Sequence, residues 1–132
     1  MSNEAKSGTA SEGKSDVIPI DQKLVPPFID GITPDKALPL KWVQDGYKYR
    51  IDPYPGMAVG QEVGPYVEYV GHGHFFGQTR VITEDNVGAD LTFNAHGFKD
   101  PIQDGRVELY FVVKHTDGSK TESKRRVYPI GD

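Results

Sequence analysis

Two histidines separated by one glycine, His72 and His74, form the strongest metal-ligand pattern in the sequence. In an extended segment such side chains point to the same side, about 6 to 7 Å apart. A metal ion would need a third ligand, such as His96 or a carboxylate, to converge on this pair. Two histidines in a glycine-rich loop are more often ordinary polar residues, so we expect no metal site.

The same segment continues with two phenylalanines, so residues 71–77 place two imidazoles and two aromatic rings among three glycines. An aromatic loop on a rigid domain is typical of a surface that contacts a glycan or a partner protein. In the alternative interpretation, at least one phenylalanine points into the core as the next strand starts. The candidate ligand-binding residues are His72, His74, Phe75 and Phe76.

A second candidate is the densest cationic group of the chain, which consists of Lys120, Lys124, Arg125 and Arg126. These side chains could bind an anionic polymer such as lipopolysaccharide or an acidic glycan. More often, such a group protects an edge strand against aggregation.

Catalytic motifs are not found in the sequence. Serine and aspartate are plentiful, but none stands in the spacing of a nucleophile elbow, a phosphate-binding loop or a calcium loop. Glu84 and Asp85 are better explained by a helical turn that begins at Thr83 and ends at Gly88, and that crosses between two sheets. We therefore predict no catalytic residues and no enzymatic activity.

Composition indicates which classes of partner are not expected. The 132 residues carry a formal net charge of −4, with 19 acidic and 15 basic side chains mixed along the chain. This gives no broad positive field, so nucleic acid is not an expected partner. No apolar run approaches the roughly 20 residues that span a bilayer, so membrane insertion is not expected. Cysteine is absent, which excludes disulfides and cysteine-based zinc sites, and no cofactor is expected.

Alternating apolar and polar residues predict the strands that position these candidates. Large side chains share one face in three runs, which contain Tyr47, Tyr49 and Ile51; Val63, Val67 and Tyr69; and Leu91, Phe93 and Ala95. Gly64-Pro65 interrupts the second run, which favours an edge position or a bulge.

The most regular strand is predicted at residues 106–114, where Val107, Leu109, Phe111 and Val113 share a face. Asp104-Gly105 and Asp117-Gly118 flank it as turns, and a final strand near residues 124–130 completes a hairpin. Short strands at this spacing predict an all-β fold, a sandwich of two antiparallel sheets.

Three segments follow from this pattern. Residues 1–16 are polar and too poor in apolar side chains to fold, so we expect a flexible tail. Residues 17–40 are rich in proline and favour an extended lead-in that runs along the domain. Residues 41–132 are expected to form the sandwich.

Several spaced motifs resemble one known family. They comprise Tyr54-x-Gly56-Met57-x-x-Gly60, Tyr69-Val70-Gly71, Val81-x-Thr83-x-x-Asn86-Val87-Gly88-x-x-Leu91-x-Phe93, Gly105-x-Val107-x-x-Tyr110-x-Val112, and the later Gly118 and Ser123. Their order resembles the immunoglobulin-like modules that repeat in large bacterial, especially Pseudomonas, surface and adhesin-type proteins. The resemblance covers about residues 40–131 and implies an immunoglobulin-like antiparallel β-sandwich.

The chain departs from that family at identifiable places. Those repeats usually carry Gly-Asp-x-Val where this chain has Gly60-Gln61-Glu62-Val63, and tryptophan where it has Tyr69. Gly64-Pro65 resembles a small insertion, and the chain holds one copy of the module. The resemblance therefore predicts the fold more directly than the role of a spacer in a long stalk.

The expected function is that of a non-enzymatic binding or structural module on a bacterial surface or exported assembly, which adheres to a protein or glycan partner. The resemblance favours an extracellular or cell-surface location, although no signal peptide is visible. Two alternatives stay open: a virion or secretion-apparatus component that decorates a shell or tube, and a carbohydrate-binding protein that uses residues 72–76. The sequence leaves the oligomeric state open.

Overall fold

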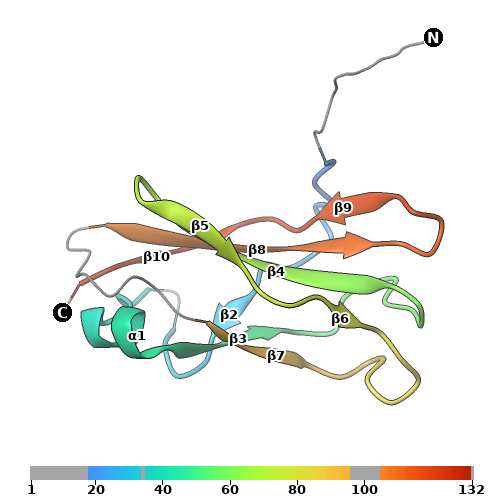
Figure 1. Ribbon diagram of the computed structural model, residues 1–132, viewed down its shortest axis with the longest axis horizontal. Coiled ribbons are helices and arrows are strands. Elements are labelled where there is room, and N and C mark those ends of the chain that lie inside the picture. Colours follow the sequence, from blue (N-terminus) through green and yellow to red (C-terminus); the bar gives the residue numbers. More distant parts are fainter. Residues whose placement is uncertain (1–17, 34, 96–104, 132) are drawn as a thin grey trace, which may run out of the picture.

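A computed structural model describes residues 18–33, 35–95 and 105–131 of the chain. The expected tail at residues 1–16 and the candidate ligand His96 lie outside the described residues. The described chain is all-β and folds into two antiparallel sheets that form two layers (Figure 1).

The larger sheet has six strands, in the order β10-β8-β4-β5, with β6 also paired to β4 and β9 also paired to β8. Its strands are β4 (Glu62–Tyr69), β5 (Gly73–Phe76), β6 (Arg80–Val81), β8 (Arg106–Lys114), β9 (Lys120–Glu122) and β10 (Arg126–Pro129). The smaller sheet has the order β2-β3-β7, formed by β2 (Phe28–Ile29), β3 (Tyr47–Ile51) and β7 (Leu91–Ala95).

Alternation along the strands sets the core, as predicted. Residues 47, 49 and 51 of β3 are buried, and so are residues 107, 109, 111 and 113 of β8. Side chains from both sheets join one buried cluster, which includes Ile29, Tyr49, Ile51, Leu91, Val63, Val67, Leu109, Phe111 and Tyr128. The two sheets therefore share a single interior, as in a β-sandwich.

Buried tyrosine hydroxyls connect the two layers. The Tyr49 hydroxyl, on β3, donates to the Tyr110 carbonyl oxygen of β8 and accepts from the Tyr66 amide of β4 at 3.3 Å. The hydroxyls of Tyr47 and Tyr69 lie 2.5 Å apart, also across the two sheets. These bonds satisfy polar atoms that would be costly to bury alone.

Pro65 corrects one expectation. An edge position for β4 is wrong, because β4 pairs with β8 on one side and with β5 and β6 on the other. The Pro65 carbonyl accepts the Gly77 amide at 3.0 Å, so the proline nitrogen also faces the β5–β6 side. On that side, the three residues 77–79 lie opposite the two residues 64–65 of β4, so the segment between β5 and β6 forms a bulge. Because the regular pairing is interrupted there, no hydrogen bond of the sheet requires the N–H group that Pro65 lacks.

The C-terminal strand expected near residues 124–130 occurs as β10, and a further strand that was not expected, β9, precedes it. β9 and β10 both pair with β8, and residues 123–125 separate them. Buried Ser123 fills the gap, since its hydroxyl accepts the Phe111 amide at 2.9 Å and its own amide donates to the Phe111 carbonyl at 2.8 Å. Arg125 is thereby set between the two strands.

One short helix, α1 (Leu40–Asp45), is absent from the sequence-based expectation. It begins directly after Pro39, whose carbonyl accepts a hydrogen bond from the Val43 amide at 3.3 Å, and it buries Val43. Upstream of it, Leu24, Ile29 and Leu38 are buried in the common core, so the described part of the proline-rich segment contributes to the core and also supplies β2 of the smaller sheet.

The turn at Thr83 forms as predicted and connects β6 of one sheet to β7 of the other. The Thr83 hydroxyl accepts the Asp85 amide at 3.2 Å, and Gly88 has a φ of 82°, in the left-handed region. Glu84 and Asp85 are exposed on this crossover.

Candidate functional site

The outer face of the six-stranded sheet carries an ordered group of solvent-facing side chains near the predicted loop. Alternation turns Tyr66 and Glu68 of β4, and Glu108 and Tyr110 of β8, away from the core. All four are half-buried, because neighbouring strands on the same face partly cover them. We call this group, with Arg125, the outer face.

An aromatic and cationic row crosses this face perpendicular to the strands. Tyr66 and Tyr110 are direct cross-strand partners, and their rings stack with centroids 5.0 Å apart and an interplanar angle of 10°. The Arg125 guanidinium lies 4.1 Å from the centroid of the Tyr110 ring. Such contacts fix the orientation of all three side chains.

Three carboxylates hold Arg125 in place. Its guanidinium lies 2.8 Å from Glu68, 3.2 Å from Glu108 and 3.7 Å from Glu122. Partial burial opposes the charge of Arg125, but the hydrogen bonds to Glu108 and Glu68 outweigh it and raise the pKa of Arg125. The row is therefore a preorganised surface on which the charge of Arg125 is neutralised and acidic side chains are in excess.

The predicted binding loop adjoins this face through the β4–β5 hairpin. Gly71 and Gly73 have φ values of 85° and 136° and allow the tight turn, where His72 is exposed. In the backbone register, His74 lies opposite Glu68, Phe75 opposite Val67 and Phe76 opposite Tyr66. The side chains of residues 74–76 lie outside the description, so the proposed roles of His74, Phe75 and Phe76 stay predictions.

Within the described residues, no group of three or more His, Asp or Glu side chains converges as a metal site would. Adding zinc should leave the melting temperature of the protein unchanged, because two histidines without a third positioned ligand bind the ion too weakly to shift unfolding. Differential scanning fluorimetry with and without zinc measures this. A rise of several degrees would make His72 and His74 ligands.

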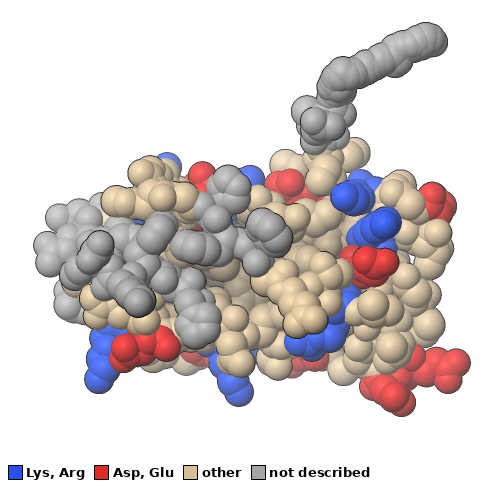
Figure 2. Space-filling model, viewed as in Figure 1, with Lys and Arg blue, Asp and Glu red and all other residues tan. Residues whose placement is uncertain are grey.

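The predicted cationic group does not form one patch. Arg125 is neutralised on the outer face, whereas Arg126 stacks 3.9 Å from the Phe28 ring and donates to the Pro27 carbonyl at 2.9 Å. Lys120 of β9 lies opposite Lys114 of β8. Figure 2 shows basic and acidic side chains interspersed over the visible face, as the mixed charge of the sequence suggests.

Tyr66, Tyr110 and Arg125 were not singled out as one site from the sequence. Tyr66 and Tyr110 each follow from alternation as outward-facing residues, but their contact depends on the β4–β8 register. Arg125, which contacts the Tyr110 ring, lies in the segment that separates β9 from β10. The alternation of apolar and polar residues predicts neither the register of β4 with β8 nor the position of Arg125 beside Tyr110.

Comparison with protein-family models, with curated proteins and with solved structures found no match. Among the described residues, no helix has both the length and the apolar character to cross a membrane.

Proposed function

We propose that this chain is a non-enzymatic binding or structural module of a bacterial surface or exported assembly, with an immunoglobulin-like sandwich as its scaffold. It contacts its partner through the outer face and the adjoining β4–β5 hairpin. The observation that carries the proposal is the ordered row of Tyr66, Tyr110 and Arg125. Tyrosine and arginine, with tryptophan, are enriched among the few side chains that dominate the free energy of protein association.

The hairpin and the row form one continuous surface. β5 pairs directly with β4, so the exposed turn at His72 lies on the same sheet as Tyr66 and Glu68. A sheet fixed on both sides by β8 and β5 moves little on binding, which lowers the entropic cost of association. The motifs that resemble bacterial surface repeats supply the proposed location.

A protein partner fits this surface better than a sugar ring. Carbohydrates usually stack on the open face of an aromatic ring, but Tyr66 lies on the β4 side of Tyr110, and Arg125 on the β9–β10 side. Both faces of the Tyr110 ring are thus covered. Ring edges, hydroxyls and carboxylates remain at the surface, and these suit hydrogen bonds with a protein.

The pKa shifts of the core tyrosines assign these residues no catalytic role. Burial raises the pKa of Tyr54 and of Tyr69 to about 12 in each case. A general acid or base works best when its pKa lies near the working pH. These shifts move the tyrosines away from neutrality and belong to the packing of the core.

Replacing His74 and Phe76 together by serine should abolish capture of the partner from a solubilised surface fraction of the organism that encodes the chain, because these residues lie opposite Glu68 and Tyr66 of the outer face in the register. The melting temperature should fall by no more than a few degrees, because contact residues contribute to association more than to folding. Lys48→Ser, on the exposed side of β3 in the other sheet, is the matched control.

Unchanged capture by the double variant would place the contact surface elsewhere. Unfolding of the double variant would show that the two residues belong to the core. A glycan array with the same proteins tests the carbohydrate alternative, since binding to a defined glycan that is lost in the double variant would favour that function instead.

A further inference from the structure

β7 is an edge strand with one open side. The Lys48 carbonyl of β3 accepts a hydrogen bond from the residue that follows β2, so the backbone groups of Lys48 face β2 and those of Tyr49 face β7. Phe93, the register partner of Tyr49, therefore turns its amide and carbonyl toward β3. Thr92 and Asn94, on either side of it, direct theirs to the open edge.

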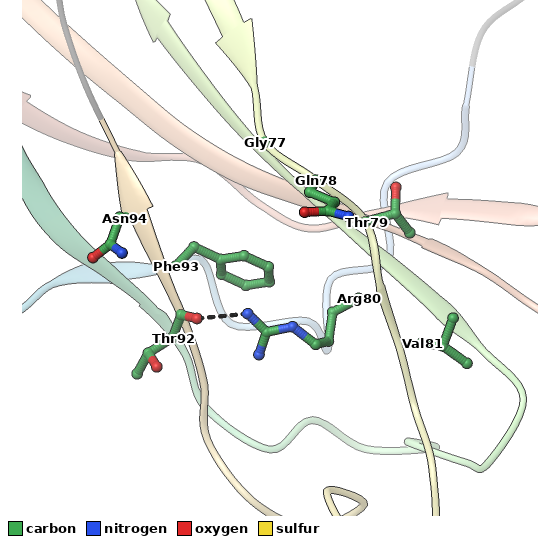
Figure 3. A pocket seen from close by; sticks show the side chains of 8 residues that line it. All are labelled: Gly77, Gln78, Thr79, Arg80, Val81, Thr92, Phe93 and Asn94. Carbon is green, nitrogen blue, oxygen red and sulfur yellow. Dashed lines mark hydrogen bonds between the residues drawn. The ribbon is translucent and has the colours of Figure 1, made fainter.

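A groove of about 490 Å³ runs along this open edge, between β7 and residues 77–81 of the larger sheet (Figure 3). Figure 3 shows Arg80 and Phe93 pointing toward each other across it. The Arg80 guanidinium lies 4.5 Å from the Phe93 ring centroid and donates to the Thr92 carbonyl at 2.8 Å. Arg80 thus covers an aromatic ring and occupies one carbonyl of the edge.

Arg80 differs from the arginines that hold carboxylates. Arg50, Arg106 and Arg125 each lie within 4.0 Å of an Asp or Glu oxygen, whereas Arg80 has no such partner in the described part of the chain. Its bonds are to a neutral carbonyl and a ring face. Its positive charge is therefore available to a carboxylate from outside.

We propose that this groove binds an extended peptide segment of a partner protein that pairs with β7 as an added strand and places a carboxylate against Arg80. Pairing along an exposed sheet edge supplies main-chain hydrogen bonds, and the pockets beside the edge select the side chains. The amides of Thr92 and Asn94 and the Asn94 carbonyl supply the pairing groups. This groove lies between the edge of the smaller sheet and residues 77–81 of the larger sheet, and it shares no lining residue with the outer face.

Binding requires Arg80 to exchange partners. A strand laid against β7 donates its own N–H to the Thr92 carbonyl, which displaces the Arg80 guanidinium from that oxygen. The carboxylate of an inward-pointing glutamate or aspartate of the peptide then accepts a charge-assisted hydrogen bond from the Arg80 guanidinium. Before binding, the same Arg80 contact blocks the open edge against non-specific strand pairing.

The test uses two fluorescein-labelled hexapeptides, one alternating threonine with glutamate and the other alternating threonine with glutamine, both blocked at their ends. Fluorescence anisotropy measures their binding to the full chain. The glutamate peptide should bind saturably and more tightly than the glutamine peptide. Arg80→Gln should weaken the glutamate peptide about tenfold and leave the glutamine peptide unchanged. Lys48→Gln is the charge-matched control and should change neither.

Asn94→Pro tests strand pairing itself. The Asn94 amide faces the open edge, so proline there removes no bond to β3 and is tolerated as in other edge strands. Binding of both peptides should be lost in this variant. If the variant unfolds, the wild-type protein still decides the question, because the amide resonances of Thr92 and Asn94 should shift on peptide addition in a ¹H–¹⁵N spectrum.

Three results would overturn the proposal. They are the absence of saturable binding at millimolar peptide, equal binding of the glutamate and glutamine peptides, and dimerisation of the chain through β7 that excludes the peptides. Loss of peptide binding has no bearing on capture through the outer face, so the two proposals fail separately.

Discussion

Replacing Phe111 by alanine should lower the free energy of unfolding by about 3 to 5 kcal/mol, as for other large-to-small changes in a core. Phe111 is fully buried in the middle of β8, and its ring lies 5.6 Å from that of Tyr54. Its backbone also anchors Ser123, which separates β9 from β10. Urea denaturation followed by circular dichroism measures the loss.

Lys48→Ala is the matched control for this measurement. Lys48 is exposed on the opposite side of β3 from buried Tyr47 and Tyr49, so its loss should cost under about 0.5 kcal/mol. Equal costs for the two variants would contradict the assignment of inward and outward faces. The comparison tests the register, because a slip of one residue exchanges the two faces of a strand.

Raising the pH above 10 should destabilise the protein steeply. Burial raises the pKa of Tyr54 and of Tyr69 from 10.0 to about 12 in the folded state, whereas the unfolded chain keeps ordinary values. The stability that the two protonated tyrosines contribute is fully present below pH 10 and is lost as the pH rises from 10 through their pKa of about 12 in the folded state. The loss reaches about 3 kcal/mol for each tyrosine, since each pKa unit corresponds to about 1.4 kcal/mol. Urea midpoints at a series of pH values, with tyrosinate absorbance, follow this transition.

Tyr69→Phe separates this effect from the titration of lysine in the same pH range. The variant lacks one buried phenol, so its stability should fall less steeply above pH 10 than that of the wild-type protein. Identical slopes in the two proteins would show that Tyr69 does not ionise with a raised pKa.

Period-two alternation predicted the strands well because each sheet has one buried face. β3 and β8 occur at the predicted residues, and their buried positions are the predicted ones. The all-β class and the crossover turn at Thr83 follow from the same local signals.

Features that depend on tertiary contacts were missed or misplaced. Helix α1 is a short element that is stabilised where Val43 packs into the core, a contact that no local pattern contains. Pro65 is accepted in a central strand because the bulge at residues 77–79 removes the need for its N–H. The strand break at Ser123 depends on bonds to Phe111, twelve residues earlier.

The candidate site was predictable only in part. The segment at residues 71–77 forms a hairpin with exposed His72, a conformation that its glycines permit. The neighbouring row was not predictable, because stacking of Tyr66 on Tyr110 requires the register of two strands more than forty residues apart. The role of Gln61 was also not predictable from the sequence. Gln61 is buried, and its side-chain oxygen accepts a hydrogen bond from the Tyr54 hydroxyl at 2.6 Å.

Site-specific cross-linking tests most directly whether the outer face and the hairpin bind the partner. A photoreactive phenylalanine analogue at position 72, in the exposed turn, is compared with the same analogue at position 48 on the other sheet. After illumination with the solubilised surface fraction, mass spectrometry should identify one protein joined at position 72 and absent at position 48. Adducts of that protein at position 48 alone, or equally at both positions, would contradict the proposed binding surface.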